Sequence, residues 1–404
     1  MSKVAPVTFN PFDPNFRIDP YATYRRLRSE DPVHQSPLGA TVLSRYADCL
    51  AVLRGRRWSS DFKNAEQPGL EPDLDILGDS RPFLFLDPPD HTRLRGVVNR
   101  AFTPRVVEGL RSRIQEIVDH LLGKVAGDGL MDVIRDVAYP LPVTVISEML
   151  GVPPDDHETF KGWSQELASS LDPTPVPSPD ALDRLQKALE SFDDYFRRLI
   201  AERRKSPRED LLSSLIEAEE EGDRLTETEL LATCRLLLVA GHETTVNLIG
   251  NGMLALLRHP DQLRKLRDDS TLAASTVEEV LRYDPPVQLT GRIALEDMEI
   301  AGVTVPKGHS VILLLGAANR DPDQFPDPER FDITRNDDSH LAFGFGIHFC
   351  VGSPLARLEG QIAFATLARR LSALELRTEA PEYKENIVLR GLRSLPVAFS
   401  TPSL

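Results

Sequence analysis

The sequence predicts a mainly α-helical protein with a smaller β region, and three observations support this. Residues 90–285 and 350–372 carry apolar side chains at helical spacing. The part up to about residue 80 and residues 286–335 are richer in β-type runs. Helices and strands do not alternate as they would in a Rossmann or barrel fold, and no repeat or glycine–serine linker divides the chain. We therefore expect a single domain over residues 1–404.

The N-terminal half begins with a short helix and a strand. The stretch "YATYRRLRSE" (21–30) predicts the helix, and "ATVLSRY" (40–46) predicts the strand. Longer helices are expected at 104–125 and 181–206, where apolar residues recur at helical spacing. Between them, four prolines at alternate positions of 169–180 exclude a helix. This segment is either a surface connection or part of a mobile lid over a buried site.

The C-terminal third has a different residue pattern, with more β-type runs. Residues 298–321 contain a Lys–Gly turn between two β-rich runs, which predicts a hairpin. A helix is expected again at 354–372, and β-like pieces follow at 375–378 and 395–400.

Composition and charge limit the possible functions. The chain has 404 residues and a net charge of −15, which argues against binding nucleic acid, because phosphate backbones attract basic surfaces. No stretch approaches the ~18 apolar residues that cross a bilayer, and the N-terminus has no signal-peptide core. We therefore expect a cytoplasmic monomer without a membrane anchor. Three widely spaced cysteines predict neither a disulfide framework nor a zinc cluster.

The expected central helix, 226–260, breaks local rules in its middle. It begins with Thr226 and Glu229 at capping-box spacing and ends before a proline. Its interior nevertheless contains Gly241 and Glu243, and an unpaired buried carboxylate costs several kcal/mol. A solvent-facing polar turn is the alternative, but apolar residues flank the site on more than one face. A carboxylate next to a hydroxyl and near a glycine suits proton delivery to a bound small molecule.

Cys350 is the second anomaly. Three glycines and a histidine surround it, and a helix begins immediately after it, so N–H donors and the helix dipole favour a thiolate. Cys49 and Cys234 lack such surroundings and are interpreted as inert buried residues. A nucleophilic role for Cys350 is the rival, but no catalytic base accompanies it. One thiolate without further protein ligands suits an iron that a macrocycle already holds, as in haem.

Five motifs now carry a family resemblance. The stretch "FGFGIHFCVG" resembles the haem-binding signature of the cytochrome P450 (haem-thiolate) family, and "AGHETT" resembles its oxygen-binding helix motif. "EVLR" (279–282) is similar to its ExxR motif, "FPDPERF" (325–331) to the region that supplies a third member, and "HTRLR" (91–95) to its haem-propionate motif. Order and spacing agree from about 14 to 400. The resemblance implies a P450 fold of the soluble bacterial type, with a long central helix over a buried haem b.

The resemblance also implies roles for individual residues. Ala240 and Gly241 would let the helix open over the haem, Thr244 would hydrogen-bond dioxygen as co-substrate, and Glu243 would relay protons. Cys350 would be the axial iron ligand. The residues expected to bind the haem propionates are His91, Arg95, Arg292 and His348. Phe343, Gly344 and Gly352 are also expected to surround the haem. A buried structural network that sets the cysteine loop would consist of Glu279, Arg282 and Arg330.

The implied partners are a hydrophobic small-molecule substrate and a ferredoxin-type protein with an NAD(P)H-dependent reductase. The residues expected to line the pocket are Leu236, Val239, Val287, Gln288, Leu289 and Arg393, of which Gln288 or Arg393 could anchor a polar group. The residues expected to form a basic patch for the electron donor are Arg93, Arg100, Arg105, Arg111, Arg113 and Arg357.

The expected reaction is hydroxylation or epoxidation by a monooxygenase. The same haem site could instead catalyse oxidative coupling, desaturation or peroxide-driven oxidation. A haem sensor without turnover is a further alternative, and the adjacent Glu243 and Thr244 speak against it because a carrier needs no proton relay.

Overall fold

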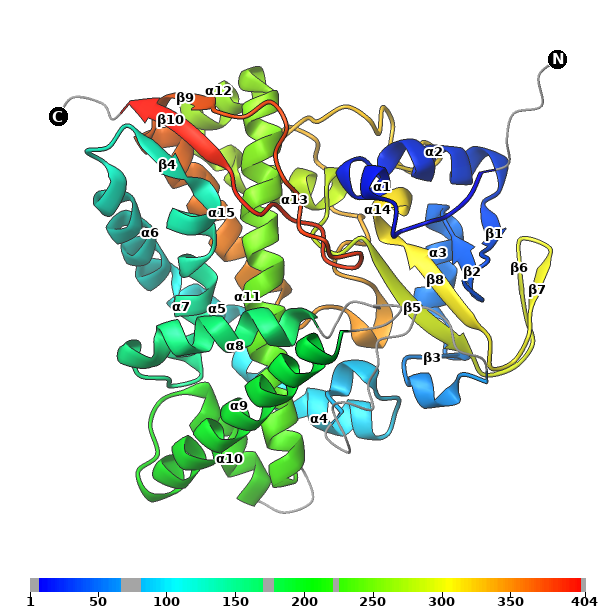
Figure 1. Ribbon diagram of the computed structural model, residues 1–404, viewed down its shortest axis with the longest axis horizontal. Helices are drawn as coiled ribbons and strands as arrows, with labels where there is room; N and C mark the ends of the chain where they lie inside the picture. Colours follow the sequence, from blue (N-terminus) through cyan, green and yellow to red (C-terminus); the bar gives the residue numbers. More distant parts are fainter. Residues whose placement is uncertain (1–6, 67–80, 170–177, 221–224, 401–404) are drawn as a thin grey trace.

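The computed structural model describes residues 7–66, 81–169, 178–220 and 225–400. Helices gather around one central helix on one side of the molecule, and the largest sheet lies on the other side (Figure 1). The predicted class, mainly α with a smaller β region, is confirmed. Much of the predicted connection or lid at 169–180 lies outside the described residues.

The central helix is α11 (Glu227–Arg258), whose 32 residues span roughly 48 Å at ~1.5 Å per residue. The predicted capping box is present: the Glu229 amide donates to Thr226 Oγ1 at 3.2 Å, and the Thr226 amide donates to Glu229 Oε2 at 2.8 Å. α11 packs against α7 (Pro140–Met149), α8 (His157–Ser169) and α15 (Ser353–Arg370). The predicted long helix through the middle of the protein is confirmed.

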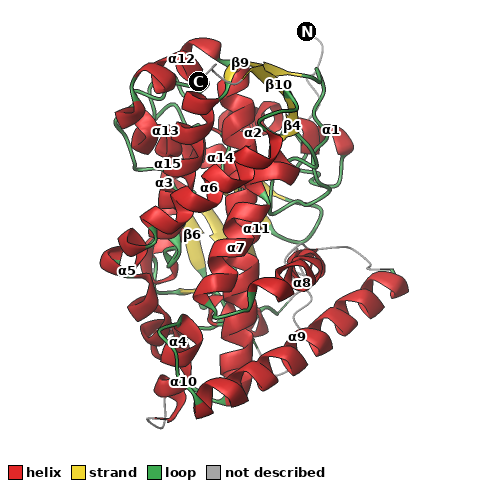
Figure 2. Ribbon diagram, turned by 90° about the vertical axis from the view of Figure 1, so that its left-hand side faces the viewer, coloured by secondary structure: helices red, strands yellow, loops and turns green. Residues whose placement is uncertain are grey.

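The other helices surround α11. Figure 2 shows the longest of them, α9, lying obliquely at one end of the molecule. Their bounds are α1 Pro14–Ile18, α2 Tyr21–Glu30, α3 Tyr46–Arg54, α4 Asp90–Asn99, α5 Pro104–Gly109, α6 Arg111–Val125, α9 Pro179–Lys205, α10 Leu211–Glu220, α12 Pro260–Asp268, α13 Ala273–Tyr283 and α14 Leu315–Ala318. The predicted helix over 104–125 is two helices, because the chain turns after Gly109, a weak helix former.

The strands form three sheets. The largest has the order β1-β2-β8-β5-β3, with β2 and β8 parallel and the other pairs antiparallel. A second has the order β4-β10-β9, and β6 pairs with β7. Their bounds are β1 Val33–Gln35, β2 Thr41–Leu43, β3 Trp58–Ser59, β4 Leu130–Asp132, β5 Leu289–Ala294, β6 Met298–Ile300, β7 Val303–Val305, β8 Ser310–Leu314, β9 Ser372–Leu376 and β10 Pro396–Ser400.

The prediction of a hairpin at the Lys–Gly turn is wrong, because the hairpin in this region turns at an earlier position. The hairpin turns at Ala301–Gly302, where both residues have positive φ (48° and 82°), between β6 and β7. The Lys307–Gly308 turn instead leads into β8, which pairs with β5 and β2. Gly302 adopts a positive φ without the clash that a side chain would cause. The chain can therefore turn at Ala301–Gly302, before it reaches the Lys–Gly pair.

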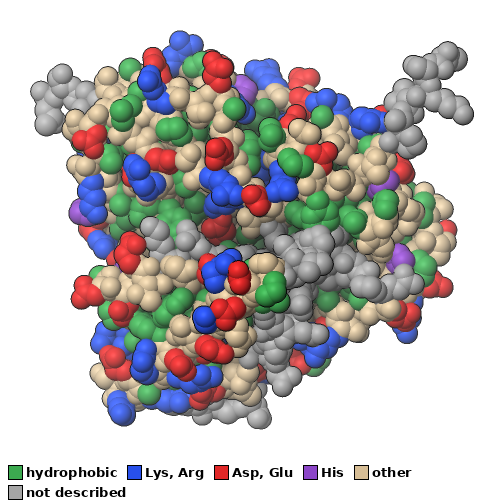
Figure 3. Space-filling model, viewed as in Figure 1, with side chains coloured by type: hydrophobic (Ala, Val, Ile, Leu, Met, Phe, Trp, Pro, Cys, Tyr) green, Lys and Arg blue, Asp and Glu red, His purple; other side chains and the backbone are tan. Residues whose placement is uncertain are grey.

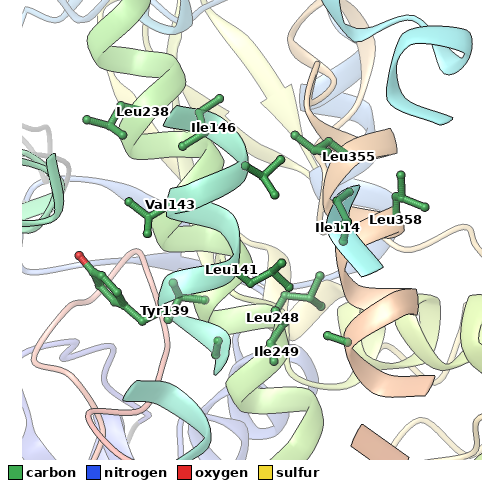
Figure 4. Packing of buried hydrophobic residues seen from close by; sticks show 14 of the residues in the cluster. Ile114, Tyr139, Leu141, Val143, Ile146, Leu238, Leu248, Ile249, Leu355 and Leu358 are labelled. Atoms are coloured by element: carbon green, nitrogen blue, oxygen red, sulfur yellow. The ribbon is translucent and has the colours of Figure 1, made fainter. Parts of the chain in front are cut away.

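A single large apolar cluster fills the space between the helices. Figure 4 shows side chains of α6, α7, α11 and α15 packed there, among them Ile114, Leu141, Leu248 and Leu355. Each of these four is at most 3 % exposed, and burying one such side chain stabilises the fold by about 1.5–3 kcal/mol. The described helices include none that is long and apolar enough to span a membrane.

Candidate active site

The middle of α11 is accessible on one face only. Every residue from Leu230 to Leu256 is buried except Ala240, Gly241 and Thr244. Ala240 and Thr244 lie one turn apart and so share a face of the helix. A small molecule can therefore reach α11 in its interior at the predicted oxygen-binding motif.

The predicted opening of the helix at this motif is wrong for this structure, because α11 is continuous through it. Thr244 Oγ1 donates to the Ala240 carbonyl oxygen at 2.6 Å, so the hydroxyl is bonded to the preceding turn. A Cβ at Gly241 would stand 3.4 Å from Cδ1 of Ile146 on α7, which is an ordinary van der Waals distance, so the packing of α7 on α11 does not require a glycine there.

Glu243 lies on a different face of α11 from Thr244. Its predicted burial is confirmed at 4 % exposure, but the carboxylate is paired. Lys384, in the segment between β9 and β10, forms an ion pair with Glu243 and also donates to Asn247 Oδ1 at 3.1 Å. Sequence reasoning missed Lys384, because nothing near it in the chain indicates a partner 141 residues away.

Cys350 lies at the end of a tightly folded loop. Gly344 and Gly346 have φ of +69° and +72°, and a Cβ at 346 would stand 2.7 Å from the Leu53 carbonyl oxygen. The Cys350 amide donates to the Phe343 carbonyl at 2.9 Å, which closes the loop just before α15. These glycines are therefore required by backbone shape.

The environment of the Cys350 sulfur contains opposing effects. Burial raises the pKa of its thiol, while the N–H groups of Gly352 and Ser353 and the nearby Arg95 guanidinium act to lower it. Cys49 and Cys234 are fully buried, and burial raises the pKa of both thiols well above the usual range. The predicted burial of Cys49 and Cys234 is confirmed.

The predicted propionate ligands converge as a cationic group. They come from α4 (His91, Arg95), β5 (Arg292) and the cysteine loop (His348). The rings of His91 and His348 are 4.1 Å apart between centroids. Arg95 donates to the carbonyl of Phe349, next to Cys350. The structure therefore brings all four residues predicted to hold the propionates together beside the cysteine.

This group contains buried ring nitrogens that the described residues leave without hydrogen-bond partners. Both ring nitrogens of His91 are buried, and neither has a hydrogen-bond partner in the part of the chain that the structure describes. Burial, followed by the charge of Arg95, lowers the pKa of His91 to about 4. Burial, followed by the charge of Arg292, lowers the pKa of His348 to about 2. Burial lowers the pKa of Arg292 to about 10. Four crowded groups that each favour an anion nearby fit a ligand with two carboxylates.

These residues fit a haem. A dianionic edge would accept a hydrogen bond from the His91 ring and neutralise the Arg95 and Arg292 charges, and an iron at Cys350 would stabilise its thiolate against burial. Nearby Asp87 is already engaged with the 59–60 backbone and side chains, including the Ser60 amide at 2.9 Å.

The structural network is confirmed in two members and wrong in the third. Arg282 and Glu279 form an ion pair at 2.7 Å with both side chains fully buried. The Arg330 side chain is 63 % exposed and pairs with Asp332, and only its carbonyl takes part, accepting from Arg282 at 3.1 Å. Arg335 approaches Glu279 instead, at 3.3 Å. The motif stretch ended at residue 331, four residues too early to include it.

The predicted pocket residues divide into two groups. Leu236 and Val239 lie on α11 just before Ala240 and belong to the large apolar cluster. Val287 forms an isolated bridge with Leu389, and Leu289 packs in a separate cluster.

The two residues predicted as polar anchors, Gln288 and Arg393, both have partners within the protein. Gln288 is 3 % exposed, accepts from the Tyr24 hydroxyl at 3.1 Å and donates to the Pro285 carbonyl at 2.9 Å, so its side chain is engaged within the fold. Arg393 is half exposed and pairs with Glu385 at 3.0 Å.

The predicted basic patch is largely neutralised. Arg93, Arg111, Arg113 and Arg357 each form an ion pair with a neighbouring carboxylate. Arg100 and Arg105 are exposed, and no ion-pair partner is found for either among the described residues. On the face shown in Figure 3, basic and acidic side chains are interspersed.

Comparison with known proteins identifies the family of the chain. A model of the cytochrome P450 family matches residues 35–396. The cytochrome P450 monooxygenase PikC of Streptomyces venezuelae is 46% identical over 95% of this chain and 92% of that protein. Ligand-free CYP164A2 of Mycobacterium smegmatis is 47% identical with a TM-score of 0.89, covering 96% of this chain and 98% of that one. Myxobacterial CYP267B1 in complex with myristic acid is 44% identical with a TM-score of 0.87, covering 96% and 98%. The chain therefore belongs to the cytochrome P450 family of oxidoreductases.

Proposed function

We propose that this protein is a haem-thiolate monooxygenase that hydroxylates or epoxidises a hydrophobic small molecule. The observation that carries the proposal is the cationic group with the unpartnered His91 beside the Cys350 loop. It supports haem b, whose iron the Cys350 thiolate would hold and whose propionates His91, Arg95, Arg292 and His348 would bind. A haem held there would supply the activation of dioxygen, with a thiolate that would favour this chemistry.

The protein residues would bind, orient and deliver protons. Thr244 has a rotatable hydroxyl on the accessible face of α11, and it can exchange its bond to the Ala240 carbonyl for one to a ligand on that face. Glu243 is the neighbouring residue, and its buried carboxyl group would relay protons toward Thr244. Leu236 and Val239 would exclude water from the same region.

The substrate and the electron donor belong to the same proposal. CYP267B1, which is 44% identical, binds myristic acid, and this supports a hydrophobic substrate. The sequence has no flavin or iron–sulfur motif, so electrons would come from a ferredoxin-type protein and its NAD(P)H-dependent reductase. The exposed Arg100 and Arg105 would attract such an acidic partner.

An isotope experiment tests this function. The holoenzyme is supplied with NADPH, a ferredoxin and its reductase, myristic acid as the probe, and ¹⁸O₂. The proposal predicts a product that carries one ¹⁸O atom and depends on NADPH. A product without ¹⁸O, or the absence of any NADPH-dependent product from myristic acid and a panel of macrolide, steroid and terpene compounds, would contradict it.

A further inference from the structure

Arg93 lies on the helix that carries two of the proposed propionate ligands, but on its opposite side. His91 and Arg95 are four residues apart on α4 and so share a face. Arg93 is two residues from each of them, which places it roughly half a turn away at ~100° per residue. The guanidinium of Arg93 is therefore directed away from the proposed haem edge, and the proposed function gives it no role.

A single guanidinium joins the first turns of two helices. Arg93 Nη1 and Nη2 donate to the two carboxylate oxygens of Glu229 at 3.1 and 2.6 Å, and Glu229 lies in the first turn of α11. Nη2 also donates to Asp90 Oδ1 at 2.9 Å, at the start of α4. Glu229 is itself held in place, because its carboxylate accepts from the Thr226 amide at 2.8 Å in the capping box. α4 is thus anchored to the N-terminal end of the central helix (Figure 1).

The contact between Arg93 and Glu229 fixes an orientation more than it stabilises the fold. The two side chains are 31% and 24% exposed, and ion pairs that water reaches contribute little to stability. The residues of α4 that join the large apolar cluster are Leu94, Val97 and Val98. Apolar contacts are non-directional, whereas a two-pronged bond between guanidinium and carboxylate has a preferred geometry. The bond to Glu229 therefore sets how α4 is rotated about its own axis, and with it where the propionate-binding face points.

The two charges stabilise each other. Hydrogen bonding to Glu229, and then to Asp90, raises the pKa of Arg93, and hydrogen bonding to Arg93 lowers the pKa of Glu229. Both groups therefore stay charged at neutral pH, and the anchor does not depend on the titration of either.

We propose that Arg93 is a positioning residue of the haem site: by holding Glu229, it keeps the propionate-binding face of α4 in place. This inference rests on the proposed function. It goes beyond that function because it assigns part of haem retention to a contact on the side of α4 that faces away from the haem edge. Coupling between two sites is typically ~5–150-fold, and the low end applies here because water reaches the pair. Loss of the anchor should therefore speed haem dissociation about fivefold.

Haem transfer measures the effect of the anchor. Holoenzyme is mixed with an excess of apomyoglobin, and the movement of haem is followed by absorbance. Arg93→Met should raise the rate of haem dissociation about fivefold. Glu229→Gln should do the same, because glutamine can keep the capping box but lacks the charge. The double variant should match either single variant, since both substitutions remove the same contact.

Arg113→Met is the matched control. Arg113 pairs with Glu148 on α7 at 2.7 and 3.0 Å and with Glu116 on its own helix, α6, at 3.1 Å. It therefore also joins two helices through one guanidinium, but the helices are α6 and α7. The control should lower Tm about as much as Arg93→Met, yet change the rate of haem dissociation by less than about 1.5-fold.

Hydrogen exchange of the holoenzymes separates positioning from structure. Backbone amides of α4 should exchange faster in Arg93→Met than in Arg113→Met. Faster exchange of α4 with unchanged haem dissociation would show that the contact is only structural and would overturn the proposal. Equal acceleration of haem loss in Arg113→Met, or additive effects of the two single substitutions, would overturn it as well.

Failure of the proposed function gives a different result. Wild-type protein that holds no haem would contradict the proposed function and this inference together. Wild-type protein that holds haem, but loses it as fast as Arg93→Met does, would contradict the inference alone.

Discussion

Replacing Arg335 by Met tests the corrected structural network. The Arg335 side chain is 14% exposed, approaches Glu279 at 3.3 Å and donates to the carbonyls of Pro326 and Asp327 at 2.8 and 3.2 Å. Losing two partly exposed hydrogen bonds costs about 1 kcal/mol, and leaving Glu279 with Arg282 as its main counter-charge costs about another 1 kcal/mol. We therefore expect the free energy of unfolding to fall by about 2 kcal/mol.

Arg330→Ala is the matched comparison. The pair of Arg330 with Asp332 is exposed, and the carbonyl that accepts from Arg282 is retained in the variant. An exposed pair contributes about 0–1 kcal/mol, so this substitution should cost about 0.5 kcal/mol. The two substitutions remove the same charge at positions only five residues apart in the sequence, yet the loss of stability should differ several-fold between them.

Thermal unfolding of the holoenzyme, followed by far-ultraviolet circular dichroism, measures both. An unfolding entropy of ~2.1 cal/mol/K per residue gives roughly 0.85 kcal/mol/K for 404 residues, so 2 kcal/mol corresponds to a Tm decrease of about 2–3 °C. Arg330→Ala should lower Tm by less than about 1 °C. If Arg330→Ala lowers Tm as much as Arg335→Met, the assignment of Arg335 to the network is refuted.

Three further substitutions test the site. His91→Phe removes two buried nitrogens that have no partner among the described residues, so the apoprotein should keep its Tm while haem content after purification falls; normal haem retention would contradict a propionate role. Gly346→Ala places a Cβ 2.7 Å from the Leu53 carbonyl at a φ of +72°, so it should lower the stability of the holoenzyme, measured by Tm, by about 1–3 kcal/mol. In the control Gly302→Ala the added Cβ meets no neighbouring atom within 4 Å, so the loss of stability should be smaller. Thr244→Val keeps the shape of the side chain but removes the hydroxyl, so NADPH-driven hydrogen peroxide release should rise at least several-fold while the affinity for haem is unchanged; unchanged coupling would remove Thr244 from proton delivery.

Features with local causes could be predicted from the sequence. The bounds of α11 follow from a capping box at one end and a proline at the other, and both signals lie within a few residues of the helix. The Cys350 loop was predictable because its glycines and the following helix are contiguous with the cysteine. The convergence of His91, Arg95, Arg292 and His348 required the family resemblance, since α4, β5 and the cysteine loop are far apart in the chain.

Features that depend on distant partners could not be predicted in this way. The ion pair of Glu243 with Lys384 forms between segments 141 residues apart and has no periodic signal. Gln288 was expected to line the pocket, but its side chain bonds to the Tyr24 hydroxyl and the Pro285 carbonyl, and the sequence around Gln288 gives no signal of a partner 264 residues away. The third member of the network was misplaced by five residues, because a motif fixes a region of the chain and the packed structure selects the side chain within it.

The most direct test of the central claim is the absorption spectrum of the reduced protein under carbon monoxide, for wild type and for Cys350→Ser. Ligation of haem iron by the Cys350 thiolate predicts a strongly red-shifted Soret band in the wild type that the variant loses. A band at the position typical of histidine-ligated haem, present in both proteins, would contradict the assignment of Cys350 and with it the proposed chemistry of α11.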